Sequence, residues 1–235
     1  MLGEPPHFST REHNPSRTYA EKVCVDKRLR LAMAAGHCLV YGIGVANDWT
    51  FERSLAERGC EVHLFDPTVK HAARPDARFR NIAFHEWGLQ SASTVAYNES
   101  ASRKQHHYGT VHGTLLSFSA MRQKLGHENR TISVLKVDCE GCEWEALTQI
   151  PRVSWDKVDQ FVVELHMGTA NGFQSDADLR RATQLVTLLS STGLRLWYSE
   201  PNVGGDAKLA AVMPPLLAAG YPASEGSNVQ QGWIR

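Results

Sequence analysis

The sequence has no excess of charge of either sign, since 25 Lys and Arg residues balance 25 Asp and Glu residues. Proteins that bind nucleic acid or an anionic membrane surface through charge usually gather positive residues. The sequence also lacks an apolar run long enough for a membrane-spanning helix. Its first residues show neither the basic nor the apolar region of a signal peptide. We therefore expect no nucleic-acid partner, no membrane partner and, by default, a cytoplasmic location.

The cysteines are few and irregularly spaced, which predicts no disulfide framework. The five residues are Cys24, Cys38, Cys60, Cys139 and Cys142. Free cysteines beside apolar runs behave as small hydrophobic residues. Cys139 and Cys142 form a lone C-x-x-C pair, but zinc would need further ligands, and a redox pair normally stands at a helix start in a thioredoxin-like pattern. We expect this pair to bind no metal.

The length of 235 residues suits a single domain. Residues 1–20 are polar and contain three prolines, which predicts a flexible N-terminal arm. Residues 21–208 alternate short apolar runs with helical patterns, which is typical of βαβ units. This pattern predicts one Rossmann-like α/β sheet, mainly parallel, with helices on both faces. Residues 209–235 break the pattern and are expected to form an atypical C-terminal tail.

Apolar runs predict the strands, and capping residues predict where the helices begin. Helices are expected after Asn47 or Asp48, after Ser117 and after Ser175, because these side chains can accept hydrogen bonds from the first turn. The carboxyl ends of parallel strands meet at one edge of the sheet, and in open α/β sheets ligands bind there. The expected strands are 38–41, 62–65, 82–87, 132–137, 161–165 and 194–198.

Two features at this edge predict a nucleoside-type cofactor. Gly42 and Gly44 lie between a strand and a helix, where glycine lets the backbone approach a ligand and N–H groups favour a carboxylate. We add Asn47, at the helix start, to this candidate set. Asp66 ends the next strand, where a carboxylate can accept both ribose hydroxyls. The alternative is a tight turn with an aspartate that caps a loop. Asn47 stands where the dinucleotide fingerprint has its third glycine, which counts against NAD.

Acidic residues at the end of the strand 132–137 are the candidates for chemistry. Asp138 and Glu140 are two residues apart on an extended strand end, so both side chains are expected to face the sheet edge. There they can hold an ammonium group, orient an acceptor hydroxyl or act as a general base. Glu143 and Glu145 are better explained by the positive end of the following helix.

His166 completes the candidate catalytic set, after Asp138 and Glu140 in that order. Glu164 and His166 leave a strand at the same edge, where they could contact an acceptor or a divalent ion; alternatively His166 simply ends the strand. We assign no metal-binding residue.

Several segments together resemble the FkbM-related methyltransferase-like proteins of animals. The likeness covers roughly residues 24 to 202. The segments are Cys38-Leu39-Val40-Tyr41-Gly42-Ile43-Gly44, Asp48-Trp49-Thr50-Phe51-Glu52, Phe65-Asp66-Pro67, Gly88-Leu89, Leu135-Lys136-Val137-Asp138, Glu140-Gly141 and Tyr198-Ser199-Glu200-Pro201-Asn202.

This resemblance implies a class I methyltransferase fold and the cofactor S-adenosylmethionine. It places Gly42 and Gly44 near the methionine part of the cofactor and Asp66 at its ribose. It places the turn containing Gly88 and Leu89 near the adenine, and Asp138 near the transferring methyl group. The family usually carries other residues at positions 139 and 142, which makes the C-x-x-C pair incidental.

We therefore predict an S-adenosylmethionine-dependent methyltransferase that methylates oxygen in an unidentified small-molecule or glycan-type acceptor. One alternative is an NAD-dependent oxidoreductase, which would need a second mononucleotide-binding half and a Tyr/Lys or His catalytic pair. Another is a non-catalytic binding module with the same fold. Binding of S-adenosylmethionine against NAD separates the first two.

The end of the sequence departs from the expected pattern. Class I methyltransferases usually insert a final antiparallel strand between the strands expected at 161–165 and 194–198. A strand paired on both sides needs its backbone donors, and proline has none. The apolar segment 209–213 runs directly into Pro214 and Pro215. We therefore expect the final strand to be missing or reduced to a few residues before Pro214.

Overall fold

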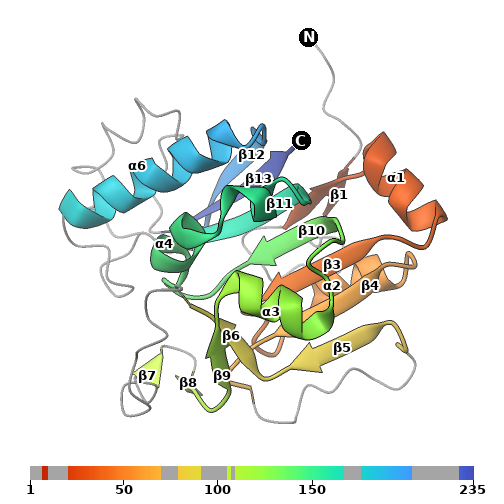
Figure 1. Ribbon diagram of the computed structural model, residues 1–235, viewed down its shortest axis with the longest axis horizontal. Coiled ribbons are helices and arrows are strands. Elements are labelled where there is room, and N and C mark those ends of the chain that lie inside the picture. The colour runs from red at the N-terminus through yellow and green to blue at the C-terminus, as the bar shows by residue number, and fades with distance from the viewer. Residues whose placement is uncertain are drawn as a thin grey trace.

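The computed structural model describes residues 7–9, 21–69, 79–90, 105–106, 109–166, 176–202 and 228–235. Its centre is a seven-stranded sheet in the order β12-β13-β11-β10-β3-β4-β5, which runs from the top to the bottom of Figure 1. β13 is antiparallel to both of its neighbours, and the other strands are mutually parallel. The predicted mainly parallel α/β sheet is confirmed. The strands are β3 (Leu39–Ile43), β4 (Glu61–Phe65), β5 (Ile82–His85), β10 (Ile132–Val137), β11 (Val158–His166), β12 (Arg195–Asn202) and β13 (Asn228–Ile234).

Helices cover both faces of the sheet, as predicted, because the central strands are apolar on both sides. In β3, Leu39 and Tyr41 face one hydrophobic cluster and Val40 faces the other. The first cluster includes residues of α3, α4 and α6, and the second includes residues of α1 and α2. The helices are α1 (Lys27–Ala34), α2 (Thr50–Ala56), α3 (Phe118–Leu125), α4 (Glu143–Ala146), the 3-10 helix η3 (Leu147–Gln149), α5 (Arg152–Trp155) and α6 (Asp176–Ser191).

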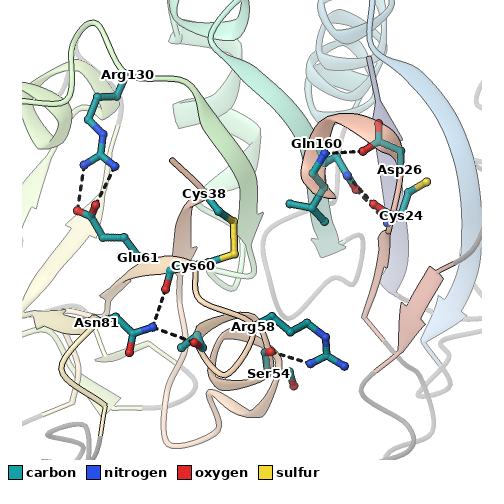
Figure 2. The surroundings of a disulfide bond; sticks show 12 residues. Cys24, Asp26, Cys38, Ser54, Arg58, Cys60, Glu61, Asn81, Arg130 and Gln160 are labelled. Atoms are coloured by element: carbon teal, nitrogen blue, oxygen red, sulfur yellow. Dashed lines mark hydrogen bonds and ion pairs between the residues drawn. A yellow bond between two sulfur atoms is a disulfide. The ribbon is translucent and has the colours of Figure 1, made fainter. Parts of the chain in front are cut away.

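Short strands lie outside the central sheet. Three two-stranded pairs form: β1 (His7–Ser9) with β2 (Lys22–Cys24), β6 (Trp87–Leu89) with β9 (Thr114–Leu116), and β7 (Gln105–His106) with β8 (Gly109–Thr110). β1 is the described part of the predicted N-terminal arm. The Gln160 side chain joins β2 to β11, because it accepts from the Cys24 backbone N–H at 2.9 Å and donates to the Cys24 carbonyl at 2.7 Å (Figure 2).

Local signals placed both ends of α3 correctly, whereas the N-cap position of α2 is Trp49 rather than Asn47 or Asp48. Ser117 caps α3 by accepting from the Ala120 N–H at 3.2 Å, and Gly126 ends it with a φ of 68°. Asp48 accepts from the Thr50 N–H at 3.0 Å at the start of α2. These interactions are local, so the sequence spacing alone could indicate them.

The expectation for the final strand was wrong. β13 is seven residues long and pairs along its whole length with β11 and β12, beyond rather than before Pro214. Its polar composition suggested a disordered tail, but Gln230 and Gln231 are buried and Trp233 joins the core. The segment contains no proline, so both edges keep their donors. Segment 209–213 lies outside the described residues.

The expectation of free cysteines was also wrong, because four of the five form disulfide bonds. Cys38 pairs with Cys60, Cys139 pairs with Cys142, and Cys24 remains a buried free thiol. Cys38 and Cys60 each directly precede a strand, and β3 and β4 are parallel neighbours that begin in register. The two residues therefore stand side by side at the same sheet edge (Figure 2).

We predict that the bond between Cys38 and Cys60 contributes about 3 kcal/mol to the free energy of unfolding, because it closes a loop with a sequence separation of 22. The Cys38→Ala/Cys60→Ala variant should therefore unfold at a lower urea concentration than the unaltered chain. Cys24→Ala serves as a control for the loss of a buried sulfur atom. Alkylation of the denatured, unreduced protein should label one cysteine, Cys24. An unchanged urea midpoint in the double variant would contradict the prediction.

Candidate functional site

The carboxyl ends of β3, β4, β10 and β11 bring the predicted site residues to one edge of the sheet. Gly44 follows β3, Asp66 follows β4 and Asp138 follows β10, while His166 ends β11. These four strands are consecutive neighbours in the sheet, so segments far apart in the sequence meet here.

The two glycines after β3 are required by contacts within the protein. A Cβ atom at position 42 would lie 2.5 Å from Glu52 Oε1, and one at position 44 would overlap the carbonyl oxygen of Asp138. Gly44 also has a φ of 78°, which favours glycine. Its N–H donates to the Phe65 carbonyl at 2.8 Å. Gly44 therefore lets the loop after β10 pack directly against the loop after β3, and Gly42 makes room for Glu52 of α2.

Asp66 holds the two loops after β3 and β4 together. Its Oδ2 accepts from the Ala46 N–H at 2.8 Å, and its Oδ1 accepts from the N–H and the hydroxyl of Thr68 at 2.8 and 2.6 Å. The two carboxylate oxygens offer about four acceptor positions, so Oδ2 keeps one more. Asp66 thus has a structural role beside the predicted ribose contact.

The other candidate cofactor residues differ in exposure. Asn47 is exposed, and it is the neighbouring Asp48 that accepts from the Thr50 N–H at the start of α2. Gly88 and Leu89 are buried in β6, and a Cβ atom at Gly88 would lie 2.6 Å from Pro67 Cγ. The expected turn at Gly88 and Leu89 is therefore a strand, and its backbone packs against Pro67 in the turn that follows Asp66.

The candidate catalytic residues meet around the ring of His166. The Nε2 atom of His166 lies 3.6 Å from Asp138 Oδ1 and 3.2 Å from Glu140 Oε1. Glu164 Oε1 lies 3.6 Å from the same nitrogen. Glu140 has a φ of 55°, a conformation uncommon for residues with a side chain, which turns the loop back toward β11. The structure thus brings all three predicted residues together.

Glu143 has a role that the sequence did not indicate. We expected it to favour the start of the following helix, but it is fully buried beneath His166. Its Oε1 accepts from the backbone N–H of His166 at 2.8 Å and lies 2.7 Å from His166 Nδ1. Its Oε2 accepts from the Gly141 N–H at 3.0 Å. Glu143 therefore fixes both the ring orientation of His166 and the turn after Glu140.

A buried lysine lies behind this edge and was also missed. Lys136 Nζ lies 2.9 Å from Glu21 Oε1, 3.5 Å from Glu52 Oε1 and 3.9 Å from Asp138 Oδ2. Burial opposes its positive charge, but these carboxylates raise the pKa of Lys136 well above its usual range. A lysine inside an apolar strand was the available signal, since charged residues are almost never fully buried unless paired.

Carboxylates outnumber cations at this edge, and the pKa values of Asp138 and His166 are both raised. Burial, with the charge of Glu164, raises the pKa of Asp138. Burial disfavours the charged ring of His166, but its close contacts with the Glu140 and Glu143 carboxylates and the charge of Glu164 raise its pKa to about 12. The site therefore favours a positive charge.

A second histidine cluster packs elsewhere on the sheet. His63 Nδ1 lies 2.9 Å from His85 Nε2, and His63 Nε2 lies 2.9 Å from Glu61 Oε1. His127 Nδ1 lies 2.8 Å from the Tyr41 hydroxyl. Arg130 forms two hydrogen bonds with the Glu61 carboxylate, at 3.0 and 2.7 Å (Figure 2). These contacts join β4 to β5 and join the segment after α3 to β3 and β4.

Burial, together with neighbouring positive charge, lowers the pKa values of His85 and His127 to about 4. In the unfolded chain, histidine titrates near 6.5, so the unfolded state binds more protons between about pH 4 and 6.5. The free energy of unfolding should therefore rise with pH across this window. His85→Gln should flatten the rise, whereas the exposed control His37→Gln should keep it. Urea unfolding at a series of pH values checks this, and equal slopes in all three proteins would contradict it.

The sheet order, with one antiparallel strand inserted beside its end, is that of the class I methyltransferase fold. The family model of the methyltransferase domain matches residues 14–208, and the chain belongs to this family. Its members are S-adenosylmethionine-dependent methyltransferases, which counts against the NAD-dependent oxidoreductase. The narrower relationship to FkbM-related proteins stays a prediction.

Two curated relatives carry the same domain. Human probable methyltransferase-like protein 24 is 30% identical over 181 residues, covering 75% of this chain and 43% of that protein. The rat protein of the same name is 28% identical over 183 residues, again covering 75% of this chain and 43% of that protein. The chain therefore spans less than half the length of these relatives.

Solved structures are similar at a lower level. A putative hemolysin from Lactococcus lactis has a TM-score of 0.42 and 9% identity, covering 89% of this chain and 88% of that chain. The 1,6-didemethyltoxoflavin-N1-methyltransferase of Burkholderia thailandensis, solved with S-adenosylhomocysteine, has a TM-score of 0.37 and 13% identity, covering 90% of this chain and 79% of that chain. The family assignment rests on the family match alone.

Proposed function

We propose that this chain transfers a methyl group from S-adenosylmethionine to an oxygen of a small-molecule or glycan-type acceptor. One observation carries the proposal: Gly44 lies against Asp138, so the proposed cofactor loop and the proposed catalytic loop are in direct contact. Binding donor and acceptor side by side supplies much of the acceleration in methyl transfer, because the sulfonium is already activated.

The residues present fit this cofactor. Asp66 Oδ2 has an acceptor position left for a ribose hydroxyl, and the carboxylate-rich edge suits the positive sulfonium and ammonium groups. Gly42, Gly44 and Asn47 would lie along the methionine part, with Gly88 and Leu89 near the adenine.

Asp138, Glu140 and His166 would face the acceptor. Of the three, Asp138 is the first candidate to accept the proton of the hydroxyl, because it lies against the cofactor loop. Glu140 would orient the acceptor, and His166 would hold the two carboxylates in place.

The proposed compartment differs from the cytoplasmic default. Disulfides form and persist in oxidising environments and are rare in the cytosol. The structure has two, so we propose an oxidising compartment. Alkylation of the denatured, unreduced protein isolated from its natural source tests the proposed compartment. Labelling of all five cysteines would exclude an oxidising compartment. In the part of the chain that the structure describes, no helix is long and apolar enough to cross a membrane.

The ribose contact predicts that Asp66→Ala weakens binding of S-adenosylmethionine by about ten- to a hundredfold, because a charge-assisted hydrogen-bond acceptor is lost. Calorimetry measures the affinity, and circular dichroism confirms the fold. Thr68→Ala is the matched control, because it removes a hydrogen bond to Asp66 within the loop and leaves the carboxylate. If the two variants weaken binding equally, Asp66 acts through the loop rather than on the ribose.

The catalytic role predicts that Asp138→Asn folds but loses turnover. Mass spectrometry of cell extracts incubated with the protein and isotopically labelled donor first identifies the acceptor. Rates are then compared with those of Asp156→Asn, which changes an exposed aspartate at the C-terminal end of α5. Activity of Asp138→Asn within about twofold of the unaltered chain would make Asp138 structural, and Glu140 would be the next candidate.

A further inference from the structure

Three carboxylates at the sheet edge surround the ring nitrogen Nε2 of His166. Asp138 Oδ1, Glu140 Oε1 and Glu164 Oε1 lie 3.6, 3.2 and 3.6 Å from the same atom, His166 Nε2. They come from the ends of two neighbouring strands, β10 and β11, and from the loop after β10. We propose that this cluster binds a divalent cation of the Mg²⁺ or Mn²⁺ class.

The Nε2 atom of His166 is the observation that distinguishes this cluster from an ordinary acidic surface. The side chain is fully buried, and Nε2 makes no hydrogen bond of good geometry, although three carboxylate oxygens lie 3.2 to 3.6 Å from it. A buried polar atom without a hydrogen bond is costly unless something else satisfies it. An ion bound by Nε2 of the neutral ring, Asp138 and Glu140 would satisfy this nitrogen directly, with Glu164 3.6 Å from the same nitrogen.

The spacing of the ligand atoms fits an ion of this size. With metal–oxygen bonds of about 2.1 Å, two ligands at right angles in an octahedron lie about 3 Å apart. The observed separations of 3.2 to 3.6 Å from Nε2 are slightly wider than this edge. The ligand atoms of Asp138, Glu140 and His166 all lie within 4.8 Å of one another. Small side-chain rotations therefore suffice to close the ligands around an ion.

Glu143 supplies the support that a ligating histidine needs. Metal-bound histidines almost always place their second ring nitrogen against a carboxylate or carbonyl, which fixes the tautomer and the ring. Here Glu143 Oε1 lies 2.7 Å from His166 Nδ1 and also accepts from the His166 backbone N–H at 2.8 Å. Trp144 Nε1 donates to the His166 carbonyl at 2.9 Å. The ring is thus held with Nε2 facing the carboxylates.

Two other groups of potential ligands are occupied by the protein itself. The first group is Glu61, His63 and His127. Arg130 donates to the Glu61 carboxylate, and its Nη1 atom lies 3.0 Å from His127 Nε2. Cys139 and Cys142 are joined to each other. The ligands of the His166 cluster are not bonded to one another, and Lys136 beside them lies 3.9 Å from Oδ2 of Asp138, the oxygen other than the one nearest His166.

The donor set indicates the class of ion. Three carboxylates and one imidazole favour Mg²⁺ or Mn²⁺ over metals that select thiolates. Glu164 and His166 are buried and would anchor the ion, with side chains 4% and 0% exposed. Asp138 and Glu140 are 18% and 21% exposed, so an acceptor oxygen could reach the ion from their side. The approach of an acceptor to the ion rests on the proposed methyl transfer, whereas the binding of the ion does not.

Mn²⁺ binding to the full chain, without S-adenosylmethionine, tests the site. Electron paramagnetic resonance of free Mn²⁺ should show one ion bound per chain, displaced by excess Mg²⁺. Glu140→Gln and Glu164→Gln should each weaken binding by about tenfold or more, since even supporting residues of metal sites are worth that much. Glu145→Gln is the matched control, because this exposed carboxylate lies in the same segment but outside the cluster. Circular dichroism checks each fold.

The outcomes separate this proposal from the proposed function. No stoichiometric Mn²⁺ binding, or equal affinities for the unaltered chain and Glu140→Gln, overturns the metal site even if Glu164→Gln fails to fold. A calorimetric titration with S-adenosylmethionine in the absence of metal is run in parallel. If the chain binds Mn²⁺ but not S-adenosylmethionine, the methyltransferase proposal is rejected and the metal-site proposal stands.

Discussion

The ion cluster around Lys136 joins parts of the chain that are far apart in the sequence. Its ammonium group lies in the middle of the sheet and reaches Glu21 before β2, Glu52 in α2 and Asp138 at the sheet edge. Breaking a buried ion pair by removing one partner costs several kcal/mol, because the other charge is left without compensation. The positions of Glu21 beside β2, Glu52 in α2 and Asp138 after β10 therefore depend on one another. Gly42 contributes to this ion cluster, because Glu52 packs in the space that a side chain at position 42 would fill.

Elements defined by local pattern could be predicted from the sequence. The strand expected at 132–137 is β10, with the same bounds, and α3 runs between the predicted cap Ser117 and Gly126. Apolar alternation and capping act within a few residues, so one segment contains the whole signal. β11 begins earlier than expected, at Val158, because polar Asp159 and Gln160 interrupt the apolar run that marked it.

Features that depend on pairing between distant segments could not be predicted in this way. β13 contains few apolar residues, and its burial follows from its place between two strands rather than from its composition. The bond between Cys38 and Cys60 depends on the register of β3 against β4. The convergence of Asp138, Glu140 and His166 was anticipated from strand order, but Glu143 was assigned to a helix end because nothing local shows that His166 lies above it.

The position of β13 has a consequence for folding during synthesis. A ribosome makes β11 and β12 before β13, so the facing edges of these two strands have no partner until the third emerges. Unpaired strand edges are the surfaces through which chains pair wrongly with one another. The position of β13 between its neighbours is restricted further at Gly232, because the rings of Trp197 and Tyr198 occupy the space that a side chain there would fill. The nascent chain is thus most exposed to misassembly in the interval between β12 and β13, when chaperone contact would matter most.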